Sequence, residues 1–140
     1  MSSFNKYPHV FSPIKIGGME VKNRMQFSPM VSSLSTPTGG VSPELLGYIK
    51  YQAQSGVGVI TIGSTPINHT NGVDFFGALD VTSDDNMTDL RRISETVHRY
   101  GAKISCELVH AGRSAPKQFR PNLPAIAPSA IRVENGPTDI

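Results

Sequence analysis

The sequence predicts an α/β protein, specifically the N-terminal portion of a (β/α)8 TIM barrel with a β-hairpin ahead of it. Short apolar strands alternate with helical segments, and this order joins parallel strands through right-handed crossovers. No Gly-x-Gly-x-x-Gly follows any predicted strand, which argues against the open dinucleotide-binding sheet. A hairpin before the first parallel strand can form the floor of a barrel. We therefore favour the barrel over the doubly wound sheet.

The hairpin is predicted from alternating apolar residues on both sides of a glycine pair. Residues 14–16 and 19–21 form its strands, and Gly17 and Gly18 between them allow the positive φ of a tight turn. The first parallel strand follows at residues 25–28 and stops at Pro29.

The first helix is predicted to begin after Ser42, which can act as the N-cap, with Pro43 in the first turn. Gly56 is a plausible C-terminal stop. The β-branched run at residues 59–62 predicts the second parallel strand, which we expect Gly63 to end.

The second helix is predicted from apolar residues that recur every three or four positions between Met87 and Tyr100. Asp84 or Asp85 could cap it, and Gly101 ends it. The third strand covers residues 103–109. One side of that strand carries Ile104, Cys106 and Leu108.

Composition excludes several classes of protein. The net charge of +2 gives no reason to expect nucleic acid or an anionic membrane as a partner. The single cysteine, Cys106, excludes an internal disulfide and a multi-cysteine metal centre, and we expect it in the core. No histidine pair has metal-ligand spacing. No run reaches the ~18 apolar residues of a membrane span, so we expect a cytoplasmic protein.

Five prolines crowd the last quarter of the chain, which predicts a long irregular loop over residues 114–140 after the third strand. A complete barrel takes ~250 residues, whereas three strands and two helices leave a sheet edge unpaired. We therefore expect residues 1–140 to be a partial, truncated barrel domain. The remainder would come from the same polypeptide, from a second chain or from self-association.

Ligands of parallel α/β folds bind at the carboxyl ends of the strands. Ser28–Val31 follows the first strand, and Gly63–Pro66 follows the second. Glu107 lies near the end of the third strand, ahead of residues 110–113. Small residues, free backbone amides and one carboxylate at these ends predict a site for a flat ligand with polar edges.

Four motifs, in this order, resemble the N-terminal part of the Old Yellow Enzyme family. They are Phe11–Gly18, Val21–Arg24, Ser28–Met30 and the His-Ala-Gly-Arg element at residues 110–113. The branch they most resemble includes the 2,4-dienoyl-CoA reductases and bacterial enoate or bile-acid-type reductases. The resemblance covers residues 10–131 and implies FMN as cofactor.

The resemblance also implies roles for individual residues, with three departures from the family's pattern. Val31 stands where relatives commonly have Cys or Thr, and Ser33 stands where some have a substrate-contacting Tyr. Glu107 replaces the usual Gln at the pyrimidine edge of the flavin, where it can accept but not donate a hydrogen bond unless protonated. Glu107 could instead be an interior acid paired with Lys or Arg. The implied cofactor-binding residues are Ser28, Pro29, Met30, Val31, Ser64 and Glu107.

The implied activity is that of an FMN-dependent ene-reductase, with NADH or NADPH as reductant and an α,β-unsaturated carbonyl or thioester as small-molecule substrate. The family's phosphate-binding loops and proton donor match positions after Ile140, so no catalytic residue is assigned. His110 and Arg113 could contact phosphate or serve the loop structure. We expect these 140 residues alone to be inactive. The alternatives are a catalytically inactive truncated chain and an interaction module completed by a second chain.

Overall fold

The computed structural model describes residues 6–131, and its first elements are a short helix and a hairpin. Helix α2 (Pro8–Phe11) precedes strands β1 (Ile14–Ile16) and β2 (Met19–Val21), which pair antiparallel. Gly17, with φ of 58°, makes the tight turn. The predicted hairpin is confirmed at its predicted residues.

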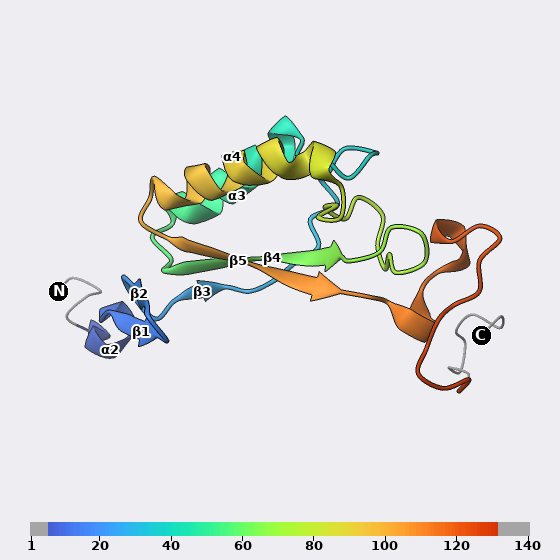
Figure 1. Cartoon of the computed structure of the whole chain (residues 1–140). Coiled ribbons are helices and arrows are strands. Elements are labelled where there is room, and N and C mark those ends of the chain that lie inside the picture. The colour runs from blue at the N-terminus through green and yellow to red at the C-terminus, as the bar shows by residue number, and fades with distance from the viewer. Residues whose placement is uncertain (1–5, 132–140) are drawn as a thin grey trace.

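Three parallel strands form the central sheet, in the order β3-β4-β5. They are β3 (Gln26–Phe27), β4 (Val59–Pro66) and β5 (Lys103–Val109). Helices α3 (Pro43–Gln54) and α4 (Met87–His98) are the crossovers, and both lie on the same face of the sheet (Figure 1). The β/α repeat predicted from the hydrophobic pattern is therefore confirmed.

The prediction that Gly63 ends the second parallel strand is wrong, because β4 continues to Pro66. The pairing register between β4 and β5 shifts between Ile62 and Thr65, and the Gly63–Ser64 peptide bond is cis. Gly63 does not end the strand. A residue without a side chain is needed at this position because Pro29 and Glu107 pack closely against it.

The helix caps explain where both helices begin. The Ser42 hydroxyl accepts a hydrogen bond from the Leu45 backbone N–H at 2.9 Å, as predicted for the N-cap of α3. Asp84 and Asp85 do not cap α4. They lie in a 3-10 turn, η1 (Asp84–Asn86), that leads into the helix at Met87.

A hydrophobic core fills the space between the helices and the sheet. Buried side chains of α3 and α4 meet the buried Ile60 of β4. Met87, at the start of the predicted apolar stripe, is 58% exposed and does not belong to the core. The helical part of the core consists of Leu45, Ile49, Ala53, Ile93 and Val97.

The face of the sheet opposite the helices carries a row of polar side chains. Gln26 Nε2 donates to Thr61 Oγ1 at 2.7 Å, and Thr61 Oγ1 lies 2.8 Å from Ser105 Oγ. One residue from each strand therefore contributes to a hydrogen-bonded layer. No described helix covers this face (Figure 1).

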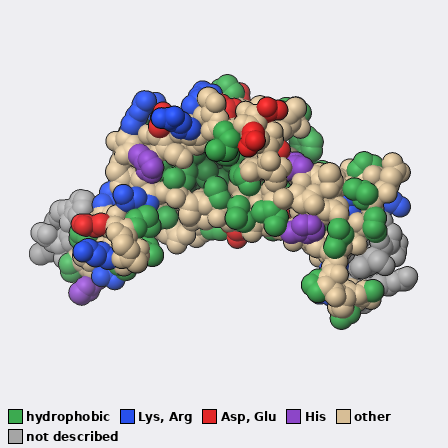
Figure 2. Space-filling view, in the orientation of Figure 1, with side chains coloured by type: hydrophobic (Ala, Val, Ile, Leu, Met, Phe, Trp, Pro, Cys, Tyr) green, Lys and Arg blue, Asp and Glu red, His purple; other side chains and the backbone are tan. Residues whose placement is uncertain are grey.

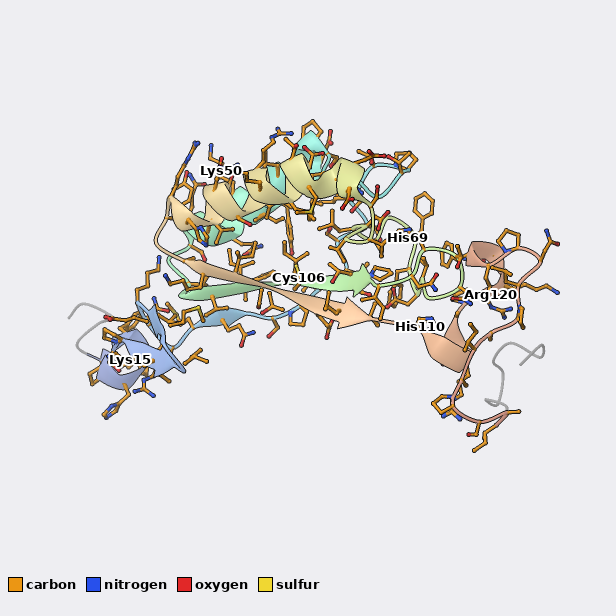
Figure 3. The ribbon with its side chains drawn as sticks, viewed as in Figure 1. Lys15, Lys50, His69, Cys106, His110 and Arg120 are labelled. Atoms are coloured by element: carbon orange, nitrogen blue, oxygen red, sulfur yellow. The ribbon has the colours of Figure 1, made fainter. Side chains whose placement is uncertain are left out.

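The outer side of β5 is less covered than the sequence suggests. Cys106, expected in the core, is exposed, and Leu108 is 64% exposed. Both lie with Ile104 along an open groove between β5 and α4, and β5 is the edge strand of the described β3-β4-β5 sheet. Figure 3 shows Cys106 midway along the sheet.

Two side chains of the Val21–Arg24 motif fix the hairpin near the C-terminal ends of the helices. Lys22 Nζ donates to the carbonyl of Tyr100 at 2.6 Å, just after α4. Buried Asn23 donates from Nδ2 to the carbonyl of Gly56 at 2.8 Å, just after α3. The hairpin therefore lies at the amino ends of the parallel strands, on the floor side.

The segment after β5 is irregular as far as it is described, with two 3-10 turns, η2 (Gly112–Ser114) and η3 (Lys117–Phe119). The fully buried Arg120 anchors it by donating to the carbonyls of Ala115 and Leu123. The rest of the predicted loop, residues 132–140, lies outside the described residues. Over residues 6–131, no helix has the length and apolar character needed to cross a membrane.

The helix side of the surface mixes basic and acidic side chains, as Figure 2 shows. Two exposed ion pairs on α4, Arg91–Glu95 and Arg92–Asp89, are part of this mixture. This face therefore has no block of one sign.

Candidate functional site

The carboxyl ends of the three parallel strands meet around Gly63. An alanine Cβ placed at Gly63 would lie 2.5 Å from Pro29 Cβ and 2.6 Å from Glu107 Oε2. Both distances are far below van der Waals contact, so only glycine fits there. The structure thus brings together Pro29 after β3, Gly63 within β4 and the acidic residue Glu107 of β5.

The segment after β3 lies open to solvent. Ser28, Pro29 and Met30 are exposed, and Val31 is half-buried. Met30 is 60% exposed, and its sulfur lies 3.8 Å from the Tyr48 hydroxyl of α3. These residues form an accessible edge of backbone and small or apolar side chains.

Glu107 provides the negative charge of the site. Its side chain is exposed and makes no hydrogen bond or ion pair with any residue of the described range 6–131. The alternative in which Glu107 is an interior acid paired with Lys or Arg therefore finds no such partner among residues 6–131. Its carboxylate oxygens are free to accept hydrogen bonds from a ligand.

The side chain of Ser64 is buried and hydrogen-bonded within the protein. It is 5% exposed, and its hydroxyl donates to Asp74 Oδ1 at 2.9 Å. The neighbouring Thr65 hydroxyl donates to the Glu107 backbone carbonyl at 2.6 Å. The proton of the Ser64 hydroxyl is therefore engaged within the protein, and a ligand would meet the backbone of Gly63–Ser64 first.

The sequence predicts Gly63 in the ligand-binding segment Gly63–Pro66 but not its close packing against Pro29 and Glu107, and it gives no signal for Asp74. A small residue inside a strand is a signal of such close approach. Asp74 lies ten residues beyond Ser64 in an irregular loop, so no periodic pattern relates the two.

Ser33, the predicted substrate contact, lies in a loop held by the segment after β4. It is exposed and has a positive φ of 56°. Gly77 packs against it so closely that a Cβ there would lie 2.8 Å from the Ser33 carbonyl oxygen. Phe75 and Phe76, 53% and 72% exposed, precede this contact.

His110 lies just beyond the end of β5 (Figure 3). Its Nδ1 accepts a hydrogen bond from the Gly112 backbone N–H at 3.0 Å, so the proton of the neutral ring is on Nε2. The ring packs against Gly72. Arg113 is exposed on the following turn. The hydrogen bond from Gly112 supports a role of His110 in the loop structure. The Nε2–H group of the same ring is available to donate to a ligand.

His69 forms a separate contact in the loop after β4. Its Nε2 lies 3.3 Å from Oδ1 of the buried Asp80 without making a hydrogen bond, and that oxygen accepts from the backbone N–H and hydroxyl of Thr82. Among residues 6–131, no three His, Cys, Asp or Glu side chains group as a metal site.

The family model for the NADH:flavin oxidoreductase / NADH oxidase family matches residues 9–138. The chain therefore belongs to this family of FMN-dependent oxidoreductases, whose reductants are NADH and NADPH. This confirms the predicted family, whose members are oxidoreductases that use FMN.

Individual relatives agree with this assignment. The chain is 32% identical over 125 residues to NADH oxidase of Thermoanaerobacter brockii, covering 89% of this chain and 19% of that protein. It is 32% identical over 123 residues to NADPH dehydrogenase of Halalkalibacterium halodurans, covering 87% of this chain and 35% of that protein. The chain thus spans about a third or less of these relatives.

Solved structures confirm the fold as the N-terminal part of this barrel. Old Yellow Enzyme from Pichia sp. AKU4542 superposes with a TM-score of 0.79 at 30% identity, over 88% of this chain and 32% of that one. Morphinone reductase in complex with tetrahydroNAD superposes with a TM-score of 0.80 at 25% identity, over 92% of this chain and 35% of that one.

The site residues fit one part of FMN, the isoalloxazine ring. Because Gly63 has no side chain, Pro29 and Glu107 pack closely over its backbone and the three strands form one continuous surface there. The unpartnered Glu107 carboxylate can accept from a ring N–H at the edge of that surface. These residues would hold the ring.

Proposed function

We propose that this chain supplies one side of the flavin-binding face of an FMN-dependent oxidoreductase that reduces an activated C=C bond. The reductant is NADH or NADPH, and the substrate is an α,β-unsaturated carbonyl or thioester. The single observation that carries the proposal is the meeting of Pro29, Gly63 and Glu107 at the strand ends. The chemistry that FMN would supply when held by these residues is hydride transfer between the nicotinamide and the alkene.

The chain's own residues bind and orient in this scheme. Glu107 accepts a hydrogen bond at the pyrimidine edge of the ring, and the backbone at Met30 and Ser64 offers further polar contacts. Ser33, held by Gly77, lies on the loop that faces the substrate. No proton donor to the substrate is assigned within residues 1–140.

The domain proposal follows from the same placement. Residues 1–140 form a partial FMN-binding TIM-barrel domain, with residues 114–140 as the loop after the third parallel strand. The remaining strands would cover the outer edge of β5 and enclose the polar layer of Gln26, Thr61 and Ser105. The proposal includes a cytoplasmic setting, with no nucleic acid or membrane as partner.

A second candidate is an interaction module whose open edge receives another chain, including a second copy of this one. The observation that favours it is the exposure of Leu108 and Cys106 along the uncovered side of β5. An exposed strand edge with apolar neighbours is a site for strand addition. Size measurement of the purified chain distinguishes this candidate, which predicts a stable complex that forms without FMN.

The experiment for the first proposal uses the protein expressed from its own gene. We expect it to copurify with or take up FMN and to oxidise NADH or NADPH only when an enone or enoyl thioester is present. Glu107→Ala should lower FMN affinity by about tenfold, the cost of one charge-assisted hydrogen bond. Glu44→Ala, in the exposed first turn of α3, is the matched control and should leave FMN affinity unchanged.

Two results would contradict the proposal. The first is a protein that binds no FMN at concentrations up to the millimolar range. The second is unchanged FMN affinity in Glu107→Ala, which would remove Glu107 from the site.

A further inference from the structure

Two carboxylates lie on either side of the Gly63–Ser64 backbone. Glu107 Oε2 is 2.6 Å from where a Gly63 Cβ would be. Asp74 Oδ1 accepts the Ser64 hydroxyl at 2.9 Å. The two acids come from different parts of the chain, one from β5 and one from the loop after β4. The segment expected to meet the flavin ring is therefore flanked by acids.

Neither carboxylate is neutralised by a neighbouring cation within residues 6–131. The ion pairs of that range engage other acids, namely Asp80, Glu95 and Asp89. Glu107 has no side-chain partner there, and Asp74 has one neutral donor, Ser64. A neighbouring Lys or Arg would have cancelled the negative potential that Asp74 and Glu107 produce at the ring. Within residues 6–131, no Lys or Arg forms an ion pair with either acid.

We propose that Asp74 and Glu107 lower the reduction potential of the flavin bound at Gly63–Ser64. Glu107 acts by direct contact at the ring edge. Asp74 acts as a positioning residue, with its charge held beside the ring through the Ser64 hydroxyl. The inference rests on the proposed function, because it requires FMN at this face.

The physical reason is the charge that reduction adds. Hydride transfer from the nicotinamide brings two electrons and one proton, so a neutral oxidised ring becomes an anion. Nearby carboxylates repel that anion but not the neutral ring, and exclusion of water by the ring strengthens the repulsion. The oxidised form is therefore bound more tightly than the reduced form, and the reduced flavin is a stronger hydride donor to the alkene.

The size of the effect follows from Coulomb's law. A unit charge within roughly 10 Å of the ring, at an effective dielectric constant of about 20, changes the affinity ratio of reduced to oxidised flavin by about tenfold. For a two-electron couple, a tenfold change corresponds to about 30 mV.

The test measures the flavin potential in the FMN-loaded protein expressed from its own gene. Glu107→Gln and Asp74→Asn keep size and hydrogen-bonding capacity while removing one charge each. We expect each to raise the potential by about 30 mV. Asp85→Asn, an exposed acid in η1 away from Gly63, is the matched control and should leave it unchanged.

Ser64→Ala separates charge from hydrogen bond. It keeps the Asp74 charge but removes the hydroxyl that holds this charge beside the ring, so we expect a smaller rise in potential than in Asp74→Asn. A potential that rises in Ser64→Ala but not in Asp74→Asn would contradict the role given to the Asp74 charge. Should Asp74→Asn fail to fold, the exposed Glu107→Gln alone still decides the inference.

The outcomes separate this inference from the proposed function. Wild-type protein that binds no FMN contradicts the proposed function. Protein that binds FMN with the same potential in wild type, Glu107→Gln and Asp74→Asn overturns the inference and leaves the proposed function standing.

Discussion

Replacing Gly63 by alanine tests the close packing of the three strand ends. The added Cβ would lie 2.5 Å from Pro29 Cβ, whereas carbon atoms in contact are about 3.5–4.0 Å apart. The Glu107 carboxylate, at 2.6 Å, can swing away, but the proline ring is fixed to the backbone. The segment after β3 must therefore shift by about 1 Å, at a cost of about 1–3 kcal/mol, typical of overpacking.

Two assays follow this perturbation. Urea denaturation should show the loss of stability directly, and the melting temperature should fall by about 4 °C for each kcal/mol lost. Flavin fluorescence quenching should show FMN affinity reduced at least about tenfold, because the protruding methyl group displaces the ring.

Gly47→Ala is the matched control for this substitution. Gly47 lies on the exposed face of α3, and nothing is within 4 Å of a Cβ built there. Alanine should stabilise that helix by about 1 kcal/mol through propensity alone and leave FMN affinity unchanged. Equal stability and equal FMN affinity in Gly63→Ala and wild type would refute the packing argument.

Three further predictions concern stability and reactivity. Asn23→Ala removes the buried hydrogen bond to the Gly56 carbonyl and should lower the free energy of unfolding by about 1–3 kcal/mol in urea titration; no loss would contradict its linking role. Ser42→Ala leaves the Leu45 N–H of α3 uncapped and should cost about 1 kcal/mol by the same assay, while Ser42→Asn should recover most of it. Although Cys106 is exposed along the groove beside α4, partial desolvation by the surrounding protein raises the pKa of its thiol. Iodoacetamide should therefore alkylate Cys106 more slowly than it alkylates glutathione at pH 8. The unfolded chain then loses this proton at lower pH than the folded chain, so stability should fall as pH rises past the usual thiol pKa, and Cys106→Ser should remove that slope.

The local features of the fold were predictable because short-range chemistry decides them. The Gly17–Gly18 pair sets the β1–β2 turn, and Ser42–Pro43 sets the start of α3. The 103–109 strand was predicted at its observed ends, since alternation and a preceding glycine define it. In each case the signal and the structure it specifies lie within a few residues of one another.

The errors arose where distant residues decide the outcome. Gly63 continues a strand because Pro29 and Glu107 approach it from other elements. Cys106 is exposed because the burial of a strand depends on the elements that pack beside it. Within the described residues, β5 is an edge strand with an open groove between it and α4. Sequence periodicity reports which face is apolar, not whether another element covers it.

The same distinction applies to the candidate site. The motifs placed Ser28–Val31 and Glu107 at strand ends, and the geometry at Gly63 brings the two segments together. The Ser64–Asp74 hydrogen bond could not be predicted, because a loop without regular structure carries Asp74 to β4.

The most direct test of the central claim is a titration of the protein expressed from its own gene with FMN, followed by quenching of flavin fluorescence. Saturable quenching at micromolar protein that is weakened in both Gly63→Ala and Glu107→Ala is the result we predict, because Pro29, Gly63 and Glu107 form the packed surface and its acceptor. Quenching that is absent, or that is the same in wild type and both variants, would contradict the assignment of the flavin face to Pro29, Gly63 and Glu107.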